Sequence, residues 1–322
     1  AESDHDVLIN HLHGKFMAIT LTIIIVIISF ILDYYNSNNS IFALTTTTSI
    51  LLSSIITHWG ITKLKNFKFK QIIRKEGPIE HYKKAGTPTM GGVLIVPAGI
   101  IIGNLAILPQ KNSQTVLAIS FLILSQMLIG MLDDWKSFSL NTNKGLSAKE
   151  KLILQSVSGI IFLSWASWQE LINTKISLFF ENSINIGFFI WPLALFVLLA
   201  ESNSTNLTDG LDGLASGCGA LVFTGLAIQM LLRPIGIDPT LSIFSMAMAG
   251  TWLGFLLHNR KPAKIFMGDT GSLAMGAALC GIALLSNSLW ALFVMGGVFF
   301  AESISVIIQV WVFKITKKIY GQ

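Results

Sequence analysis

Ten long apolar stretches divide this chain and leave few folds open to it. They fall near residues 16–32, 41–60, 91–109, 115–132, 151–168, 186–200, 214–232, 240–257, 271–287 and 289–313. A helix needs about 20 apolar residues to cross a bilayer, and continuous rather than alternating runs exclude a transmembrane barrel. Only 12% of the residues are charged, against about 25% in soluble domains. We therefore expect an all-α, polytopic integral membrane protein with about ten transmembrane helices.

The first apolar stretch, 16–32, runs into Asp33, Tyr34, Tyr35 and Asn36 rather than a small-residue cleavage site. A retained span is therefore expected, not a removed signal peptide. The two cysteines lie in separate apolar runs and indicate no disulfide framework and no paired-cysteine metal site.

Basic residues predict the orientation of the spans. The segments 1–15, 61–90, 133–151, 201–213, 258–270 and 314–322 hold every Lys and Arg except Lys111, Lys175 and Arg233. Positive charge marks the cytoplasmic side of a membrane protein. The basic loop 61–90 is explained by this rule and by anionic lipid headgroups, so we expect a lipid bilayer and no nucleic acid as its partner.

Five aspartates fall on the same side, at the ends of different spans: Asp133, Asp134, Asp209, Asp212 and Asp269. Ends of separate spans can meet only at a membrane surface, so we expect a cytoplasmic cleft lined by these acids. Adjacent carboxylates can hold a divalent cation, or one can act as a base once the other is neutralised. The structural alternatives are an interfacial pair that ends a helix, a solvated loop at 206–213, and a helix cap at Asp269.

Two further segments on this side have features of a nucleotide site. Pro88 and three glycines fix the turn at 84–92, where Lys84, Thr87 and Thr89 bring charge and hydroxyls to a phosphate. Phe266 would ordinarily be a core or lipid-facing residue. In a polar loop beside an aspartate it can instead stack on a base.

Four motifs occur in order at the predicted cytoplasmic ends: KAGTPTMGG at 84–92, DDWK at 133–136, NLTDGLDG at 206–213 and FMGDTGS at 266–272. Together they resemble the phospho-N-acetylmuramoyl-pentapeptide transferases (MraY), within the polyprenyl-phosphate N-acetylhexosamine-1-phosphate transferases, over roughly residues 41–320. The resemblance implies transfer of phospho-MurNAc-pentapeptide from UDP-MurNAc-pentapeptide to undecaprenyl phosphate. The products would be lipid I and UMP, made with Mg²⁺ for peptidoglycan synthesis at the bacterial inner membrane.

The resemblance also implies roles for individual residues. Asp269 is similar to the magnesium ligand, and Asp133 and Asp134 are similar to the catalytic pair. Lys149 or Lys151 resembles a substrate-phosphate contact, with Lys149 taken as the candidate. The implied substrate site further includes Lys84, Thr87, Thr89, Asn206, Asp209, Gly210, Leu211, Asp212, Asn259, Phe266 and Gln309.

The sequence departs from the family pattern at both ends. Residues 1–40 are expected to be an N-terminal extension with an extra span, and 41–322 the transferase membrane domain. The family's histidine-rich loop (M-A-P-I-H-H-H) and one last span do not follow, so a C-terminally truncated chain is expected. A relative using UDP-GlcNAc or another UDP-HexNAc remains an alternative, as does an ion-coupled transporter, which would need acids near mid-span. The oligomeric state is left open, with a homodimer as one alternative.

Overall fold

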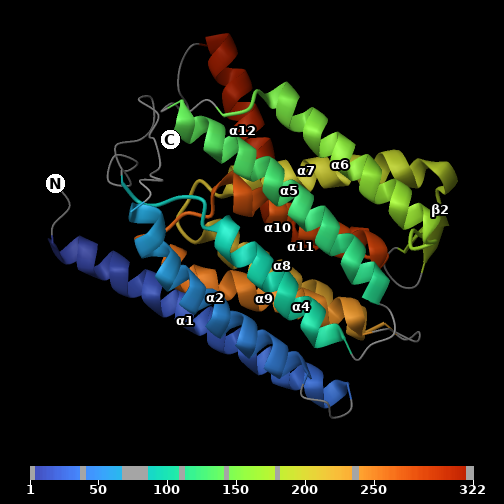
Figure 1. The fold of residues 1–322 in the computed structure, drawn as a ribbon, viewed down its shortest axis with the longest axis horizontal. Coiled ribbons are helices and arrows are strands. Elements are labelled where there is room, and N and C mark those ends of the chain that lie inside the picture. The colour runs from blue at the N-terminus through green and yellow to red at the C-terminus, as the bar shows by residue number, and fades with distance from the viewer. Residues whose placement is uncertain are drawn as a thin grey trace.

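The computed structural model describes residues 4–36, 41–66, 86–108, 113–140, 145–177, 182–233 and 239–316. Helices dominate it: α1 (Asp4–Tyr35), α2 (Ile41–Asn66), α4 (Gly92–Ile107), α5 (Ser113–Ser139), α6 (Ala148–Trp168), α7 (Ile190–Thr208), α8 (Leu214–Leu231), α9 (Thr240–Asn259), α10 (Gly268–Leu285), α11 (Leu289–Met295) and α12 (Gly297–Thr316). Most of them run along one common direction (Figure 1). The all-α prediction is confirmed.

The predicted spans agree with these helices more closely in position than in number. Within the described ranges, eight helices are long and apolar enough to cross a membrane. α4 is apolar but has only 16 residues. α6 is not among the eight, and its first turn carries Lys149, Glu150 and Lys151. The count of ten therefore remains a prediction.

The last predicted span, 289–313, is broken in the structure. α11 ends at Met295 and α12 begins at Gly297, because two adjacent glycines disfavour a continuous helix. α12 leaves the bundle at a steep angle (Figure 1), and most of its side chains are exposed. A short antiparallel pair, β1 (Lys175–Ser177) with β2 (Ser183–Asn185), and the 3₁₀ turn η2 (Gly187–Phe189) also lie outside the prediction.

The core is formed around α9 and α10, which are almost completely buried by the other helices. Large apolar side chains such as Trp252 and Phe255 of α9 fill it. α10 packs along α5 and α7, and α9 packs along α2 and α8. The ends of α5 and α7 and the start of α10 are therefore fixed relative to one another by buried contacts.

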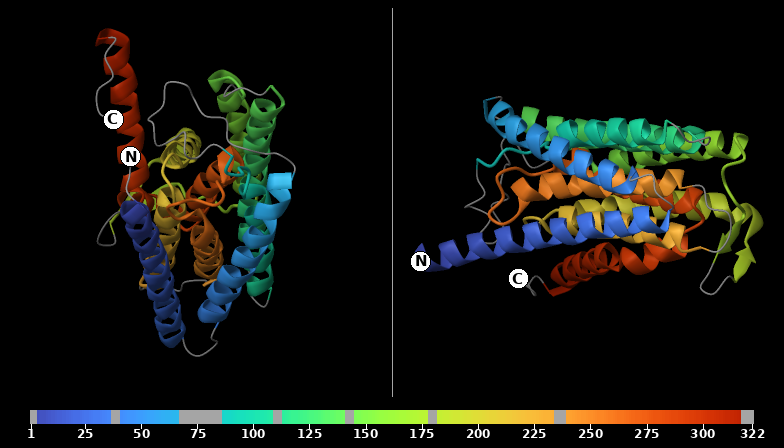
Figure 2. Two further views of the ribbon diagram at one scale, coloured as in Figure 1. Left: turned by 90° about the vertical axis from the view of Figure 1, so that its left-hand side faces the viewer. Right: turned by 90° about the horizontal axis from the view of Figure 1, so that it is seen from below.

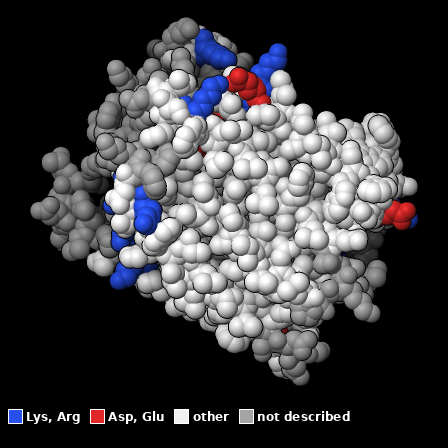
Figure 3. All heavy atoms as spheres, in the orientation of Figure 1, with Lys and Arg blue, Asp and Glu red and all other residues white. Residues whose placement is uncertain are grey.

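Charged side chains lie near the edges of the outer surface. Glu201 of α7 is an exception inside the bundle, where its backbone contacts Gly276 in the middle of α10 and its Oε1 is buried. In the face shown in Figure 3, lysine and arginine gather at the left and upper edges, and the broad centre carries no charge. Such an uncharged band is typical of a surface that faces lipid.

Candidate active site

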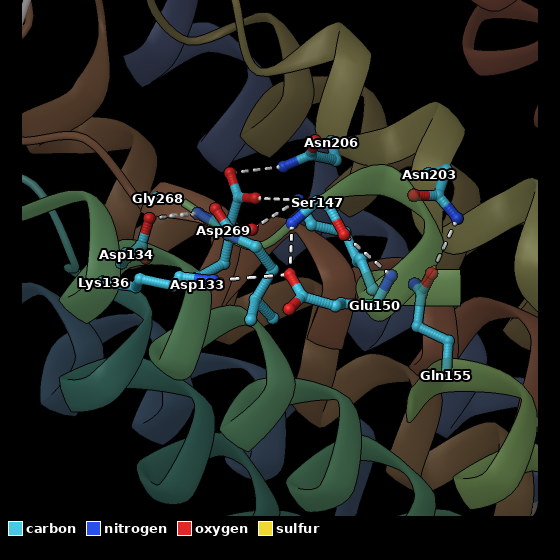
Figure 4. A network of polar contacts seen from close by, with 12 residues as sticks. Asp133, Asp134, Lys136, Ser147, Glu150, Gln155, Asn203, Asn206, Gly268 and Asp269 are labelled. Atoms are coloured by element: carbon cyan, nitrogen blue, oxygen red, sulfur yellow. Dashed lines mark hydrogen bonds and ion pairs between the residues drawn. The ribbon is translucent and has the colours of Figure 1, made fainter. Parts of the chain in front are cut away.

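Three carboxylates meet at one end of the bundle. One oxygen from each of Asp133, Asp134 and Asp269 lies within 4.8 Å of the other two. Asp133 and Asp134 belong to the last turns of α5, and Asp269 belongs to the first turn of α10. Figure 4 shows these side chains pointing toward one another. The pairing of α5 with α10 thus joins two motifs that are far apart in the sequence.

Asp134 joins the two helices directly. Its Oδ1 accepts a hydrogen bond from the backbone N–H of Asp269 (3.2 Å), and its Oδ2 accepts one from the backbone N–H of Thr270 (3.0 Å). The Thr270 hydroxyl donates a further hydrogen bond to Oδ2 (2.6 Å). The first N–H groups of a helix have no partner within the helix. Asp134 therefore caps α10 from a neighbouring helix and fixes the backbone that carries Asp269.

Lys151, in the first turn of α6, lies between the other two carboxylates. Its Nζ is 3.2 Å from Oδ1 of Asp133 and forms an even closer ion pair with Oδ2 of Asp269. All three side chains are less than one quarter exposed. An ion pair shielded from water is stronger than one on the surface, so this lysine holds α6 against α5 and α10.

Asn206, near the end of α7, is a second residue in direct contact with the Asp269 carboxylate. Its side-chain amide donates hydrogen bonds to Oδ1 of Asp269 (2.7 Å) and to the hydroxyl of Ser272 (2.9 Å). One turn earlier on α7, Asn203 donates to the side chain of Gln155 on α6 (3.0 Å). Lys151 of α6 and Asn206 of α7 thus engage the two oxygens of the Asp269 carboxylate.

Gly268 is required by this arrangement. Its φ is +72°, a left-handed value that favours glycine. A Cβ at this position would also lie only 2.5 Å from Oδ2 of Asp134. Both observations indicate that no side chain fits between Asp134 and the start of α10.

The turn before α4 lies against the segment that leads into α10. Phe266 N–H donates to the carbonyl of Pro88 (2.9 Å), and Gly91 N–H donates to the carbonyl of Phe266 (2.9 Å). Gly92 N–H donates to the carbonyl of Met267 (3.0 Å). The threonines of the 84–92 motif therefore belong to the same end of the bundle as Asp269.

A second set of contacts ties the 206–213 motif to the loop after α9. The Asn259 side chain accepts from the Gly213 N–H (3.1 Å) and the Ser216 hydroxyl (2.9 Å), and donates to the carbonyl of Ile265 (2.9 Å). Asp212 accepts from the N–H of Ala263 (2.9 Å). The two loops therefore form one connected unit.

The start of α6 is fixed by a reciprocal cap. Ser147 accepts from the N–H of Glu150, and the Glu150 carboxylate accepts from the N–H of Ser147 (2.7 Å) and pairs with Lys136 (3.3 Å). The Ser147 N–H, and to a lesser degree Lys136, lower the pKa of the exposed Glu150 carboxyl at this water-facing end. This cap sets the position from which Lys151 projects.

Comparison of the sequence with known proteins shows the family of this chain. The family model described as "Glycosyl transferase family 4" matches residues 116–287. The model described as "Phospho-N-acetylmuramoyl-pentapeptide-transferase signature 1" matches residues 84–96. The phospho-N-acetylmuramoyl-pentapeptide-transferase of Prochlorococcus marinus (strain MIT 9313) is 62% identical over 266 residues, 83% of this chain and 71% of that protein. The chain belongs to the phospho-N-acetylmuramoyl-pentapeptide-transferase family.

Two further relatives with the same name are also similar to this chain over most of its length. The protein of the same name from Synechococcus sp. (strain WH7803) is 60% identical over 84% of this chain and 74% of its own length. The one from Synechococcus elongatus is 47% identical over 83% of this chain and 72% of its own length. Family membership, together with the apolar helices, makes this chain a multi-pass membrane transferase.

The structure brings some residues of the predicted transferase site together. Asp133, Asp134, Asp269 and Asn206 form the carboxylate centre, and Lys151 rather than Lys149 is the lysine in contact with it. Lys149 is exposed one half-turn away on α6. Lys84 lies outside the described residues.

The remaining residues of the predicted substrate site differ in how exposed they are. Asn259 is almost fully buried, with its amide committed to the two loops, and the Phe266 side chain is only 6% exposed. Leu211 and Gly210 are exposed, whereas Thr87, Thr89, Asp209 and Asp212 are partly buried. Gln309 is exposed on α12, where it donates to Ser305 (3.1 Å).

The prediction missed several residues of the network. Thr270 and Ser272 both lie in the 266–272 motif, and their hydroxyls contact Asp134 and Asn206. Their position one and three residues after Asp269, in the first turn of a helix, was the available signal. Gln155 carried no such signal, because a single polar residue in a span is equally typical of helix packing. Asn203 lies in the polar run before the 206–213 motif, outside the predicted span 186–200.

The donor set of the centre fits a hard divalent cation. Mg²⁺ prefers oxygen ligands, usually one or two carboxylates together with water and substrate phosphate. Both oxygens of Asp134 are bound to the start of α10, whereas the oxygens of Asp269 contact the side chains of Lys151 and Asn206, which a bound cation can displace. Asp133 and Asp269 are therefore the residues that would hold a metal, and the ammonium of Lys151 occupies a position between them.

Proposed function

We propose that this chain transfers phospho-MurNAc-pentapeptide from UDP-MurNAc-pentapeptide to undecaprenyl phosphate, forming lipid I and UMP. The observation that supports the proposal is the carboxylate centre with Lys151 beside it at one end of the bundle, where a lipid phosphate and a soluble nucleotide would meet. An ion-coupled transporter would need its acids near mid-span. The three carboxylates of this centre lie instead at helix ends.

Charge is the main obstacle in this reaction. The attacking lipid phosphate and the diphosphate of the nucleotide sugar are both anionic, and they must approach within bonding distance. Cationic groups that face the transferring phosphoryl group lower the barrier by stabilising its charge. Mg²⁺ held by Asp133 and Asp269 would supply this stabilisation for the diphosphate, and Lys151 would supply it from α6.

The engagement of Asp134 favours a direct attack by the lipid phosphate. A carboxylate that accepts three hydrogen bonds from α10 through both oxygens is held in place and has no free oxygen to turn toward a phosphoryl group. Asp134 then acts as a positioning residue for Asp269. Asp133 is the acid of this pair that is better placed to contact the metal.

The two connected loops, 209–213 and 259–266, are proposed to bind the uridine nucleotide. They lie at the same end as the carboxylate centre, and Phe266 supplies an aromatic ring there. The basic segments on this side support an orientation with the site facing the cytoplasm, which is where a UDP-linked substrate is available. The bacterial inner membrane is the corresponding location.

The test is UMP release by the purified protein in detergent, with Mg²⁺ and undecaprenyl phosphate. UDP-MurNAc-pentapeptide and UDP-GlcNAc are offered in separate reactions. We expect UMP from the muramyl substrate alone. UMP from UDP-GlcNAc would assign the chain to a different transferase, and no UMP from either substrate would overturn the proposal.

A further inference from the structure

The N-terminal helix α1 contacts the loop that follows α9. A Cβ added to Gly14 would collide with the backbone carbonyl oxygen of Lys261, because the two backbones touch at this position. Lys261 belongs to the loop 260–264, which leads through Ile265 and Phe266 to Asp269. The start of α1 therefore rests on the backbone of a segment that leads into the carboxylate centre.

A second contact lies about two turns further along α1. Leu21 packs where α8 and α9 meet, with its Cδ2 at 3.9 Å from a Cβ built on Gly217 of α8. Leu256 of α9 lies 3.8 Å from the same point. α1 thus contacts both helix ends from which the nucleotide loops emerge, since 209–213 precedes α8 and 260–266 follows α9.

The opposite end of α1 is anchored as well. Both oxygens of Asp33 accept backbone hydrogen bonds from the first turn of α2, from Phe42 (2.9 Å) and Ala43 (2.8 Å). Asp33 is only 8% exposed. At 1.5 Å per residue, Gly14 and Asp33 are about 28 Å apart along the helix, close to the thickness of the hydrocarbon core.

Between these anchors, α1 buries one narrow stripe. Ala18, Ile25, Ser29 and Leu32 are buried at helical spacing, and the flanking apolar side chains are exposed. The helix begins at Asp4, so its first turns extend past the rest of the bundle (Figure 2). A helix that is anchored at both ends restricts the movement of the segments that pack against it.

We propose that α1 is a brace that positions the two nucleotide loops, with Gly14 as the positioning residue. The close approach at Gly14 fixes the backbone of Lys261. That backbone sets the N–H of Ala263, which bonds Asp212, and the neighbouring Asn259, which bonds Gly213. The proposal rests on the proposed function, because the loops are taken to bind the nucleotide.

The test is Gly14→Ala, which adds only the colliding methyl group. Alanine is a better helix former than glycine by about 1 kcal/mol, so loss of α1 itself cannot explain an effect. The matched control is Met17→Ala, which shortens an exposed side chain on the same helix. Leu21→Ala is a second variant that loosens the contact instead of crowding it, and it keeps the test decisive if Gly14→Ala does not fold.

Two readouts separate this proposal from the function itself. Amide hydrogen exchange at Gly213 and Ala263 should become faster by about 3- to 30-fold in Gly14→Ala, the range for substitutions that act through a packed network. KM for the UDP-linked substrate should rise over the same range, with a smaller change in kcat. The Met17→Ala protein should match the wild type in both.

Unchanged exchange at Gly213 and Ala263 would overturn the brace. Faster exchange with an unchanged KM would show that α1 orders the loops without positioning the nucleotide, which also contradicts the proposal. If the wild-type protein releases no UMP, the proposed function fails. The exchange measurement then still decides whether α1 holds the two loops.

Discussion

The Asp134 side chain on α5 and Thr270 on α10 are joined by two hydrogen bonds, one from the backbone N–H (3.0 Å) and one from the hydroxyl (2.6 Å). An acid expected from its motif to act chemically is thus also the cap of a neighbouring helix. The position of Asp269 depends on this cap, since Asp269 is the residue before Thr270.

The hydroxyl of Thr270 can be removed without changing the size of the side chain. Thr270→Val should lower the free energy of unfolding by about 1 kcal/mol, the usual contribution of one hydrogen bond. It should also reduce kcat, because Asp134 loses one of the three hydrogen bonds that fix it beside Asp269. Thermal unfolding in detergent and UMP release measure the two effects. Thr270→Ser is the control, and a Thr270→Val protein with wild-type kcat would remove Asp134 from its positioning role.

The two lysines of α6 make a matched pair. Lys151→Gln should lower kcat by about 10²-fold or more, as expected when a group that stabilises the transition state is lost. Lys149→Gln should behave like the wild type, because Lys149 is exposed and Lys151 contacts two carboxylates. If instead Lys149→Gln raises KM and Lys151→Gln does not alter kcat, the lysine predicted from the family resemblance is the correct one.

Asp269→Asn tests the metal. The substitution keeps the size and one acceptor oxygen but removes the charge that draws a cation and Lys151. Turnover should be lost at all ordinary Mg²⁺ concentrations. The protein should still fold, with a lower thermal unfolding temperature because Lys151 loses one of its two charged partners. The protein should also bind Mn²⁺, used as a spectroscopic substitute, less tightly than the wild type. Full activity of Asp269→Asn would remove Asp269 as the metal ligand.

Phe266 has two competing roles, which Phe266→Leu can separate. Leucine keeps most of the buried apolar volume, so the stability cost should stay below about 1.5 kcal/mol. Loss of the aromatic face should weaken UMP binding by about 1–3 kcal/mol if a base stacks on the ring. Calorimetric titration with UMP measures this, and an unchanged Kd would assign the buried Phe266 to packing alone.

Asn259 is predicted to act through folding of the loops. Asn259→Ala leaves the N–H of Gly213, the hydroxyl of Ser216 and the carbonyl of Ile265 without their partner, and should cost about 2–3 kcal/mol. Denaturant unfolding in detergent measures the loss. Asn173→Ala, at an exposed turn, is the control. A stable Asn259→Ala protein with a raised KM would instead indicate direct contact with the nucleotide.

The sequence predicted the membrane helices and the meeting of Asp133, Asp134 and Asp269, because apolar length and charge bias are local properties. Asp209 and Asp212, predicted to line the same cleft, are not members of this carboxylate cluster. It left the choice between Lys149 and Lys151 open, since a shift of two residues rotates a helix position by about 200°. The two adjacent glycines at 296–297 were a local signal for the break between α11 and α12, whereas the burial of Phe266 depends on packing with other elements. The hydrogen bond between Asn203 and Gln155 depends on how α7 and α6 face each other. No motif in the sequence predicts that orientation.

The bridge that Lys151 forms between Asp133 and Asp269 gives the centre its own counter-ion. With that charge in place, the two acids need no metal to remain close together in a poorly hydrated site. The fold should therefore survive complete chelation, and activity should return when the metal is restored. Under the proposed metal-dependent function, newly inserted protein would reach its final helix arrangement before it meets a divalent cation, and metal supply would control catalysis rather than assembly.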